Sequence, residues 1–158
     1  MNGGRRDRSN SIVISGGIVR IDIVISGDYC TCIIILHSGP DTLKNVDMSP
    51  CPSLPCVFHK GTNATVTIDF TTEKQVFGIT TKVYGIVAGI PIPYNLPKSN
   101  GCQGCNLICP LTPGTHRYVN VFPVLKTYPE IRLAVKWELV DENNEPLLCF
   151  VFPMQILD

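Results

Sequence analysis

Charge of either sign is scarce in this chain, and the two signs cancel. Of its 158 residues 16% are charged, with 13 basic and 13 acidic side chains, so the formal net charge is +0 at pH 7. A neutral chain has no long-range field that attracts nucleic acid or an anionic membrane, and no basic stretch here is interleaved with aromatic residues. We therefore expect no nucleic-acid partner.

Helical periodicity, long apolar runs and the short motifs of common enzymes are also missing. The apolar runs fall far short of the ~20 residues that span a bilayer, so we expect no transmembrane helix. There is no G-x-S-x-G, no H-E-x-x-H and no phosphate-binding loop, and the histidines, His37, His59 and His116, are isolated from one another. The sequence predicts neither an enzyme nor a bound metal or other cofactor.

Apolar residues, by contrast, make up 44% of the chain, enough for a sizeable core in one domain. Along residues 131–140 they follow the two-residue period of a strand. Turn-forming residues occupy 141–146, and a second extended segment covers 147–156, so an antiparallel hairpin is predicted. This hairpin would place Phe150 and its neighbours of the same parity beside Trp137, on a face that needs apolar cover.

Other short strands, divided by proline and glycine, are predicted over residues 43–48, 66–70, 77–88 and 116–122. Residues 89–97 and 123–129 are apolar but rich in proline, which cannot donate to a ladder, so both are expected to be loops. Short strands at this spacing are typical of an all-β sandwich of two antiparallel sheets with an immunoglobulin-like arrangement.

The beginning of the chain, residues 1–37, lacks the pattern of short strands divided by proline that follows it, and we expect it to be a separate segment. Residues 19–25 and 33–36 have strand-forming patterns. Three arginines near the start resemble the first part of a signal peptide, but Arg20 and Asp22 interrupt the apolar stretch that follows, and no cleavage site of small residues appears.

Eight cysteines, an even number, favour an oxidising compartment. Cys51 and Cys56 flank a proline-rich segment in which a small disulfide loop fits. Cys102 and Cys105 have the spacing of a redox or zinc-binding pair, so a thiol oxidoreductase is an alternative, although no helix follows them and no fourth metal ligand has the usual spacing. The sequon at Asn63 predicts a glycan there, in agreement with secretion.

Several segments carry a matched set of prolines, cysteines and aromatics: residues 46–52 (VDMSPCP), 85–94 (GIVAGIPIPY), 101–102 (GC), 109–111 (CPL), 124–129 (VLKTYP) and 136–141 (KWELVD). In order and spacing they resemble the Niemann-Pick C intracellular cholesterol transporter 2 family, which belongs to the ML lipid-recognition domains and is related to the mite group 2 allergens. The resemblance covers about residues 38–158. It implies an ML domain there, and leaves residues 1–37 as a divergent extension or an incorrectly assigned first exon.

The resemblance implies a monomeric carrier, secreted or in the lysosome lumen, with an apolar cavity between its sheets. One sterol would occupy the cavity and pass to a membrane surface or a membrane sterol transporter. The family's pocket positions fall on Met48, Ile92, Tyr94, Phe122, Pro123, Val124, Tyr128, Trp137 and Phe150. From the pattern alone, these residues would equally be ordinary sandwich core and packed turn aromatics.

Ligand choice stays open, because two of these positions differ from the sterol-transfer members of the family. Tyr94 stands where those members often have phenylalanine, and Phe150 where they often have tryptophan. The alternative function is a lipid-sensing protein of innate immunity or chemical signalling that binds fatty acids or bacterial lipids.

The resemblance also implies two further disulfides, one between Cys102 and Cys109 and one from the first strand to Cys149. A gapless alignment places Leu36 at the position of the first-strand cysteine. With an insertion, Cys32 is the expected partner of Cys149, and Cys30 is the alternative.

Overall fold

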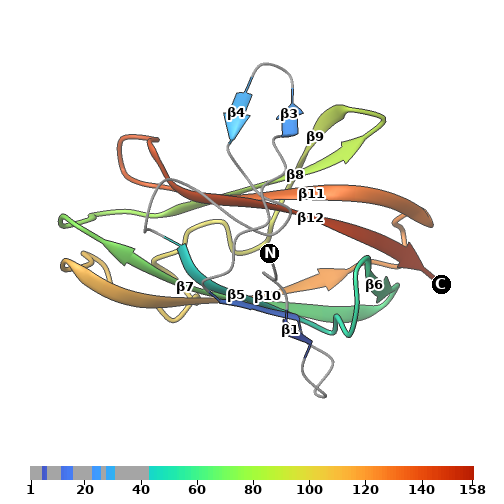
Figure 1. The fold of residues 1–158 in the computed structure, drawn as a ribbon, viewed down its shortest axis with the longest axis horizontal. Coiled ribbons are helices and arrows are strands. Elements are labelled where there is room, and N and C mark those ends of the chain that lie inside the picture. Colours follow the sequence, from blue (N-terminus) through green and yellow to red (C-terminus); the bar gives the residue numbers. More distant parts are fainter. Residues whose placement is uncertain (1–4, 7–11, 16–22, 26–27, 31–42) are drawn as a thin grey trace.

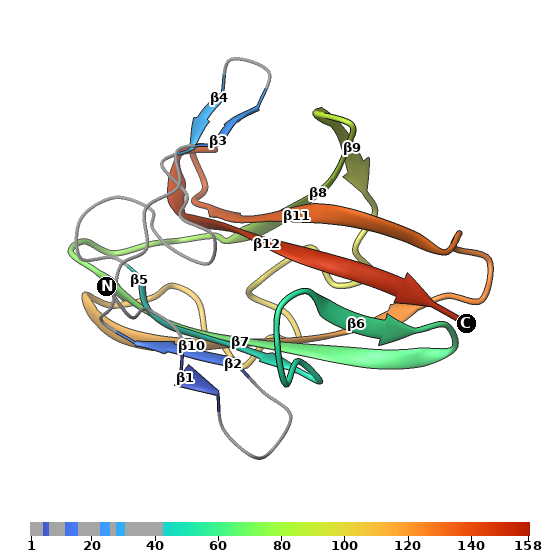
Figure 2. The ribbon, with the colours of Figure 1, turned by 45° about the vertical axis from the view of Figure 1, so that its right-hand side comes forward.

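The computed structural model describes residues 5–6, 12–15, 23–25, 28–30 and 43–158, with side chains for residues 43–158. These residues form strands and connecting loops in two facing layers (Figures 1 and 2), which confirms the predicted all-β sandwich. In the described part of the chain, no helix has the length and apolar character needed to cross a membrane.

The first sheet has the strand order β1-β2-β5-β7-β10, the second has the order β6-β12-β11-β8-β9, and β3 pairs with β4 alone. Neighbouring strands run antiparallel except for β6, which lies parallel to β12. The strands are β1 (Arg5–Arg6), β2 (Ile12–Ser15), β3 (Ile23–Ile25), β4 (Asp28–Cys30), β5 (Leu43–Ser49), β6 (Cys56–His59), β7 (Thr62–Thr72), β8 (Thr80–Val87), β9 (Ile90–Tyr94), β10 (Gly114–Val124), β11 (Ile131–Val140) and β12 (Pro146–Leu157).

The first layer is centred on β7, which pairs with β5 on one side and with β10 on the other. Alternate residues of β7 are buried, from Ala64 to Phe70, while the residues between them are partly exposed. This two-residue period turns one face toward the second layer, where apolar burial stabilises the sandwich by roughly 25 cal/mol per Å².

The second layer is centred on the predicted hairpin of β11 and β12, with Trp137 opposite Phe150 and Val135 opposite Phe152. The predicted antiparallel hairpin, with Phe150 beside Trp137, is therefore confirmed. β8 pairs with the other side of β11, and it brings Gly85 opposite Val135.

The proline-rich segment 89–97 was expected to be a loop, and that expectation is wrong for β9. This strand lies at the edge of the second sheet and pairs with β8 through a two-residue turn at Ala88 and Gly89. Both turn residues have positive φ, 51° and 79°, as a tight hairpin requires. Beyond such a turn, hydrogen-bonded and non-hydrogen-bonded residue pairs alternate along the two strands. Pro91 and Pro93 belong to the non-hydrogen-bonded pairs, so their nitrogens face away from β8.

The first two residues of the segment 123–129 also depart from the predicted loop, whereas residues 125–129 form it. Pro123 and Val124 are the last residues of β10, where they pair with Asn63 and Thr62. Because β10 is an edge strand, one side of it carries no ladder and a proline is tolerated there.

At the beginning of the chain, β2 pairs antiparallel with β5 and extends the first sheet. Of the predicted segment 19–25 the structure describes β3 only, and the predicted run 33–36 lies outside the described residues.

Candidate functional site

A cavity of about 320 Å³ lies between the two layers. Strands β8 to β12 and the loop from β10 to β11 all contribute to it. In the described part of the chain, the residues that line it are almost wholly apolar and none is charged: Val83, Gly85, Val87, Ile92, Pro93, Tyr94, Phe122, Pro123, Val124, Tyr128, Pro129, Ile131, Leu133, Val135, Trp137, Phe152, Met154 and Ile156.

Strand periodicity explains the larger part of this lining. Every second residue of β11 from Ile131 to Trp137 lines the cavity, and so does every second residue of β12 from Phe152 to Ile156. Successive side chains of a strand point to opposite faces, so the inner face of the hairpin is one continuous apolar surface.

Gly85 leaves room on β8 where a side chain would reach toward the cavity. A Cβ atom at this position would lie 3.0 Å from Cδ1 of Leu133, closer than ordinary van der Waals contact. The side chain of Leu133 therefore packs against Gly85, and a larger residue there would displace it.

An aromatic cluster closes the inner end of the cavity. The ring of Trp137 lies 5.5 Å from that of Phe122, 6.5 Å from that of Tyr118 and 6.4 Å from that of Phe150, measured between ring centroids. Trp137 is 1% exposed and Phe150 is fully buried. Such pairs are worth roughly 0.5–1.5 kcal/mol each beyond their burial, so this end is rigid.

A buried hydrogen-bond network behind this cluster joins the two layers. The hydroxyl of Tyr118 on β10 lies 2.7 Å from Oγ1 of Thr81 on β8. It also accepts a hydrogen bond from Nδ2 of Asn120, again at 2.7 Å. Burial raises the pKa of Tyr118 well above its usual value, so the phenol stays neutral.

The opposite end is the mouth of the cavity, where Ile92 is 52% exposed and two tyrosines meet. The hydroxyl of Tyr128 donates to that of Tyr94 at 2.9 Å, and the hydroxyl of Tyr94 donates to the carbonyl oxygen of Pro123 at 3.4 Å. Their rings contact edge to face, with centroids 6.0 Å apart. Burial, and then the hydrogen bond from Tyr128, raise the pKa of Tyr94 well above its usual value.

The structure brings most of the expected pocket residues to the cavity. The residues that line it are Ile92, Tyr94, Phe122, Pro123, Val124, Tyr128 and Trp137. Met48 and Phe150 are buried in the core but do not line the cavity. Phe150 lies parallel to the ring of Trp137, at 12°, and Met48 pairs with Val66 in the first sheet.

The family positions did not include the β8 residues of the lining, Val83, Gly85 and Val87, or the lining residues of the hairpin other than Trp137. A signal for them exists in the sequence, because they share one parity within segments predicted to be extended.

Two disulfides close the short loops in which they were expected, the first from the sequence itself and the second from the resemblance. Cys51 is bonded to Cys56, and Cys102 to Cys109. Cys149 is also in a disulfide, and its partner is not among the residues whose side chains are described; Cys32 lies outside the described residues.

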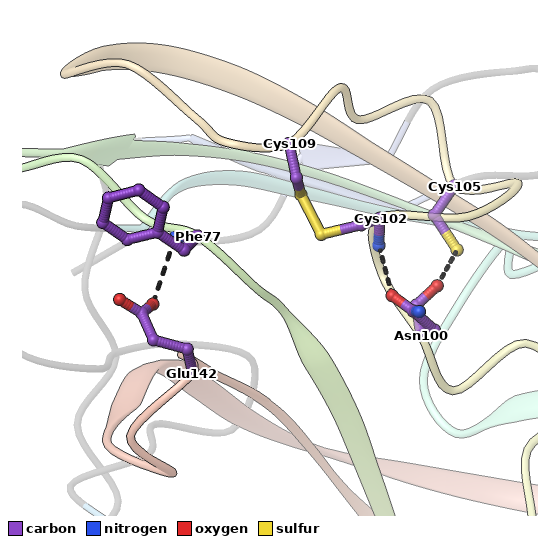
Figure 3. The surroundings of a disulfide bond; sticks show 6 residues. All are labelled: Phe77, Asn100, Cys102, Cys105, Cys109 and Glu142. Atoms are coloured by element: carbon purple, nitrogen blue, oxygen red, sulfur yellow. Dashed lines mark hydrogen bonds between the residues drawn. A yellow bond between two sulfur atoms is a disulfide. The ribbon is translucent and has the colours of Figure 1, made fainter.

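Cys105 is a free and fully buried thiol (Figure 3). Its sulfur points toward the carbonyl oxygen of Asn100, at 4.0 Å, and not toward the disulfide beside it. Nδ2 of Asn120 donates to the same sulfur at 3.7 Å. Burial raises the pKa of Cys105, which makes it a poor nucleophile. Within the described residues, no group of three or more His, Cys, Asp or Glu could hold a metal ion.

The comparisons with known proteins agree with this architecture. The sequence model of the ML domain family matches residues 27–156. The NPC intracellular cholesterol transporter 2 of Bos taurus is 39% identical over 115 residues, which are 72% of this chain and 76% of that protein. The Sus scrofa protein of the same name is 41% identical over 120 residues, 75% of this chain and 80% of that protein.

Two further likenesses come from insects. The ecdysteroid-regulated 16 kDa protein of Manduca sexta is 35% identical over 118 residues, 73% of this chain and 81% of that protein. The crystal structure of a Niemann-Pick type C2 protein from the Japanese carpenter ant superposes with a TM-score of 0.71 at 22% identity, and covers 89% of this chain and 100% of that one. At this identity the likeness shows a shared fold.

Proposed function

Since the chain belongs to the ML domain family, and within it to the NPC intracellular cholesterol transporter 2 family, we propose that it carries a sterol or a related lipid between its two sheets. The observation that supports this proposal is the apolar cavity of about 320 Å³, a size within the roughly 300 to 1,000 Å³ of ligand pockets.

The energetics of the cavity suit a rigid apolar ligand. Burying ~400 Å² of ligand surface at ~25 cal/mol/Å² stabilises the complex by ~10 kcal/mol, whereas association costs ~4 to 15 kcal/mol. Useful affinity therefore requires walls that are already in place. The aromatic cluster around Trp137 and the paired strands β11 and β12 supply them.

The same proposal includes transfer to a membrane or to a membrane transporter. The tip of the β8–β9 hairpin carries Ile90, which is 63% exposed and pairs with Val87 of the lining. On the loop from β10 to β11, Leu125 is 45% exposed and follows Val124, which also lines the cavity. Exposed apolar residues commonly mark a contact with lipid or protein, so a ligand would leave the cavity directly into the contacted surface.

The proposed location is extracellular or the lysosome lumen. Disulfides persist in such oxidising compartments, and Asn63 of the sequon is exposed at the start of β7, where a glycan would project away from the cavity.

The test of binding is a titration with a fluorescent sterol, which should show saturable one-to-one binding. Tyr128→Ser and Val124→Phe should weaken it, because the first opens the mouth to water and the second fills it. Tyr84→Phe, at a position outside the lining, is the matched control and should leave affinity unchanged. Unchanged binding in the first two variants would refute this cavity as the site, and displacement by fatty acid but not by sterol would favour the alternative function.

Transfer is tested by the rate at which loaded protein delivers sterol to vesicles. Ile90→Asp should slow delivery without changing affinity, while Ile108→Asp, at an isoleucine that is 87% exposed and absent from the lining, should not. Equal rates in the two variants would contradict a role for the hairpin tip.

A further inference from the structure

The cavity offers a ligand very few polar groups. Among the lining side chains that the structure describes, only the hydroxyls of Tyr94 and Tyr128 and the indole N–H of Trp137 can donate a hydrogen bond. The indole N–H is buried within the aromatic cluster and has no partner, and almost none of its surface is accessible. The two phenols at the mouth are therefore the groups that can meet the polar end of a ligand.

The protons of both phenols are already committed. A phenol has one proton to donate, and the carbonyl of Pro123 can only accept, so the proton of Tyr94 points toward that carbonyl. The oxygen of Tyr94 must then accept the proton of Tyr128. In this chain of hydrogen bonds, lone pairs on the two phenol oxygens remain free, and no proton does.

We propose that the hydrogen-bond chain from Tyr128 through Tyr94 to Pro123 makes the cavity selective for a lipid whose polar end is an alcohol, against the ketone or ether of the same body. An alcohol can donate a hydrogen bond to the free lone pairs of the phenol oxygens. A ketone or an ether has only acceptor oxygens, which would face these phenol oxygens without a proton between them. The inference rests on the proposed function and names the ligand chemistry of that site.

The hydroxyl of Tyr94 is the specificity-determining group in this arrangement. With phenylalanine at residue 94, the proton of Tyr128 would lose its acceptor and become available to a ligand. The mouth would then accept a ketone as readily as an alcohol. Removing a hydroxyl should thus improve binding of the ketone, which a merely structural role for Tyr94 would not produce.

The experiment compares dissociation constants of three sterols that share one ring system and differ at the polar carbon: cholesterol, its 3-ketone and its 3-methyl ether. For the wild-type protein we expect cholesterol to bind about tenfold more tightly than the ketone or the ether, the effect of roughly one hydrogen bond. In Tyr94→Phe the ketone and the ether should approach cholesterol to within about twofold. Tyr84→Phe, outside the lining, should keep the wild-type ratio.

The outcomes separate this inference from the proposed function. If all three sterols bind the wild-type protein equally, or if Tyr94→Phe leaves the ratio unchanged, the selectivity is refuted while sterol binding stands. If none of the sterols binds, both the selectivity and the proposed sterol-carrier function are refuted. Because the readout is a ratio within one protein, a general loss of stability in Tyr94→Phe cannot imitate the expected result.

Discussion

Filling the cavity with the protein's own side chain should stabilise the ligand-free protein and abolish binding. Val135 on β11 is suited to this change, because it lines the cavity and lies opposite Gly85 of β8, which has no side chain of its own. Val135→Phe adds roughly 50 Å³, and at about 24 cal/mol per Å³ of cavity the gain is about 1 kcal/mol.

Urea unfolding with and without sterol is the assay. Without ligand, Val135→Phe should raise the free energy of unfolding by about 1 kcal/mol. At a free ligand concentration one hundred times the dissociation constant, the wild-type protein should gain about 2.7 kcal/mol from binding, whereas the variant should gain almost nothing. Stability and binding should therefore change in opposite directions.

Val66→Phe is the matched control, since Val66 is fully buried in β7 but does not line the cavity. Overpacking at a filled position costs about 1–3 kcal/mol, so this variant should be less stable than the wild-type protein. If Val135→Phe is destabilised as much as Val66→Phe and still binds sterol, the space beside Val135 is not the ligand's, and the reasoning fails.

Further predictions concern the aromatic cluster and the cysteines. Trp137→Ala should lower the free energy of unfolding by about 3–5 kcal/mol in urea, and a loss under about 1 kcal/mol would contradict its place in the core. Replacing Cys51 and Cys56 together by alanine should cost about 2 kcal/mol by the same measurement, because the loop they close is short; an unchanged midpoint would argue against the bridge. Cys105 should resist alkylation in the native protein and react on unfolding, because its thiol is buried and burial raises its pKa; rapid native labelling seen by mass spectrometry would contradict this.

Strand periodicity made the β11–β12 hairpin of the second layer predictable, including the face that Trp137 and Phe150 share. The reason is local: alternation and a turn of adequate length determine a hairpin without knowledge of the rest of the chain. β6 left no such signal, because its four residues pair in parallel with β12, nearly one hundred positions further along. Its place depends on a contact that no nearby residue encodes.

The error at β9 came from applying the proline rule without knowing where the strand would lie. Proline prevents pairing in the middle of a sheet, but at an edge it blocks only the unpaired side. Pro91 and Pro93 alternate in step with the ladder, and so they protect the free edge of β9 from further pairing. The alternation was visible in the sequence, while the edge position was not.

The sequence also could not show whether the two apolar faces close on each other, and the structure explains why they do not. At the inner end, Trp137 and Phe122 fill the gap between the layers, and the hydrogen bond between Tyr118 and Thr81 fixes their separation. Toward the mouth, β8 carries Gly85 where a larger side chain would meet Leu133. Closing the layers there would require the aromatic cluster to repack, because close-packed interiors do not deform continuously. The cavity is therefore a consequence of how the core is packed, and the residues that give the protein its stability also keep the ligand's space open.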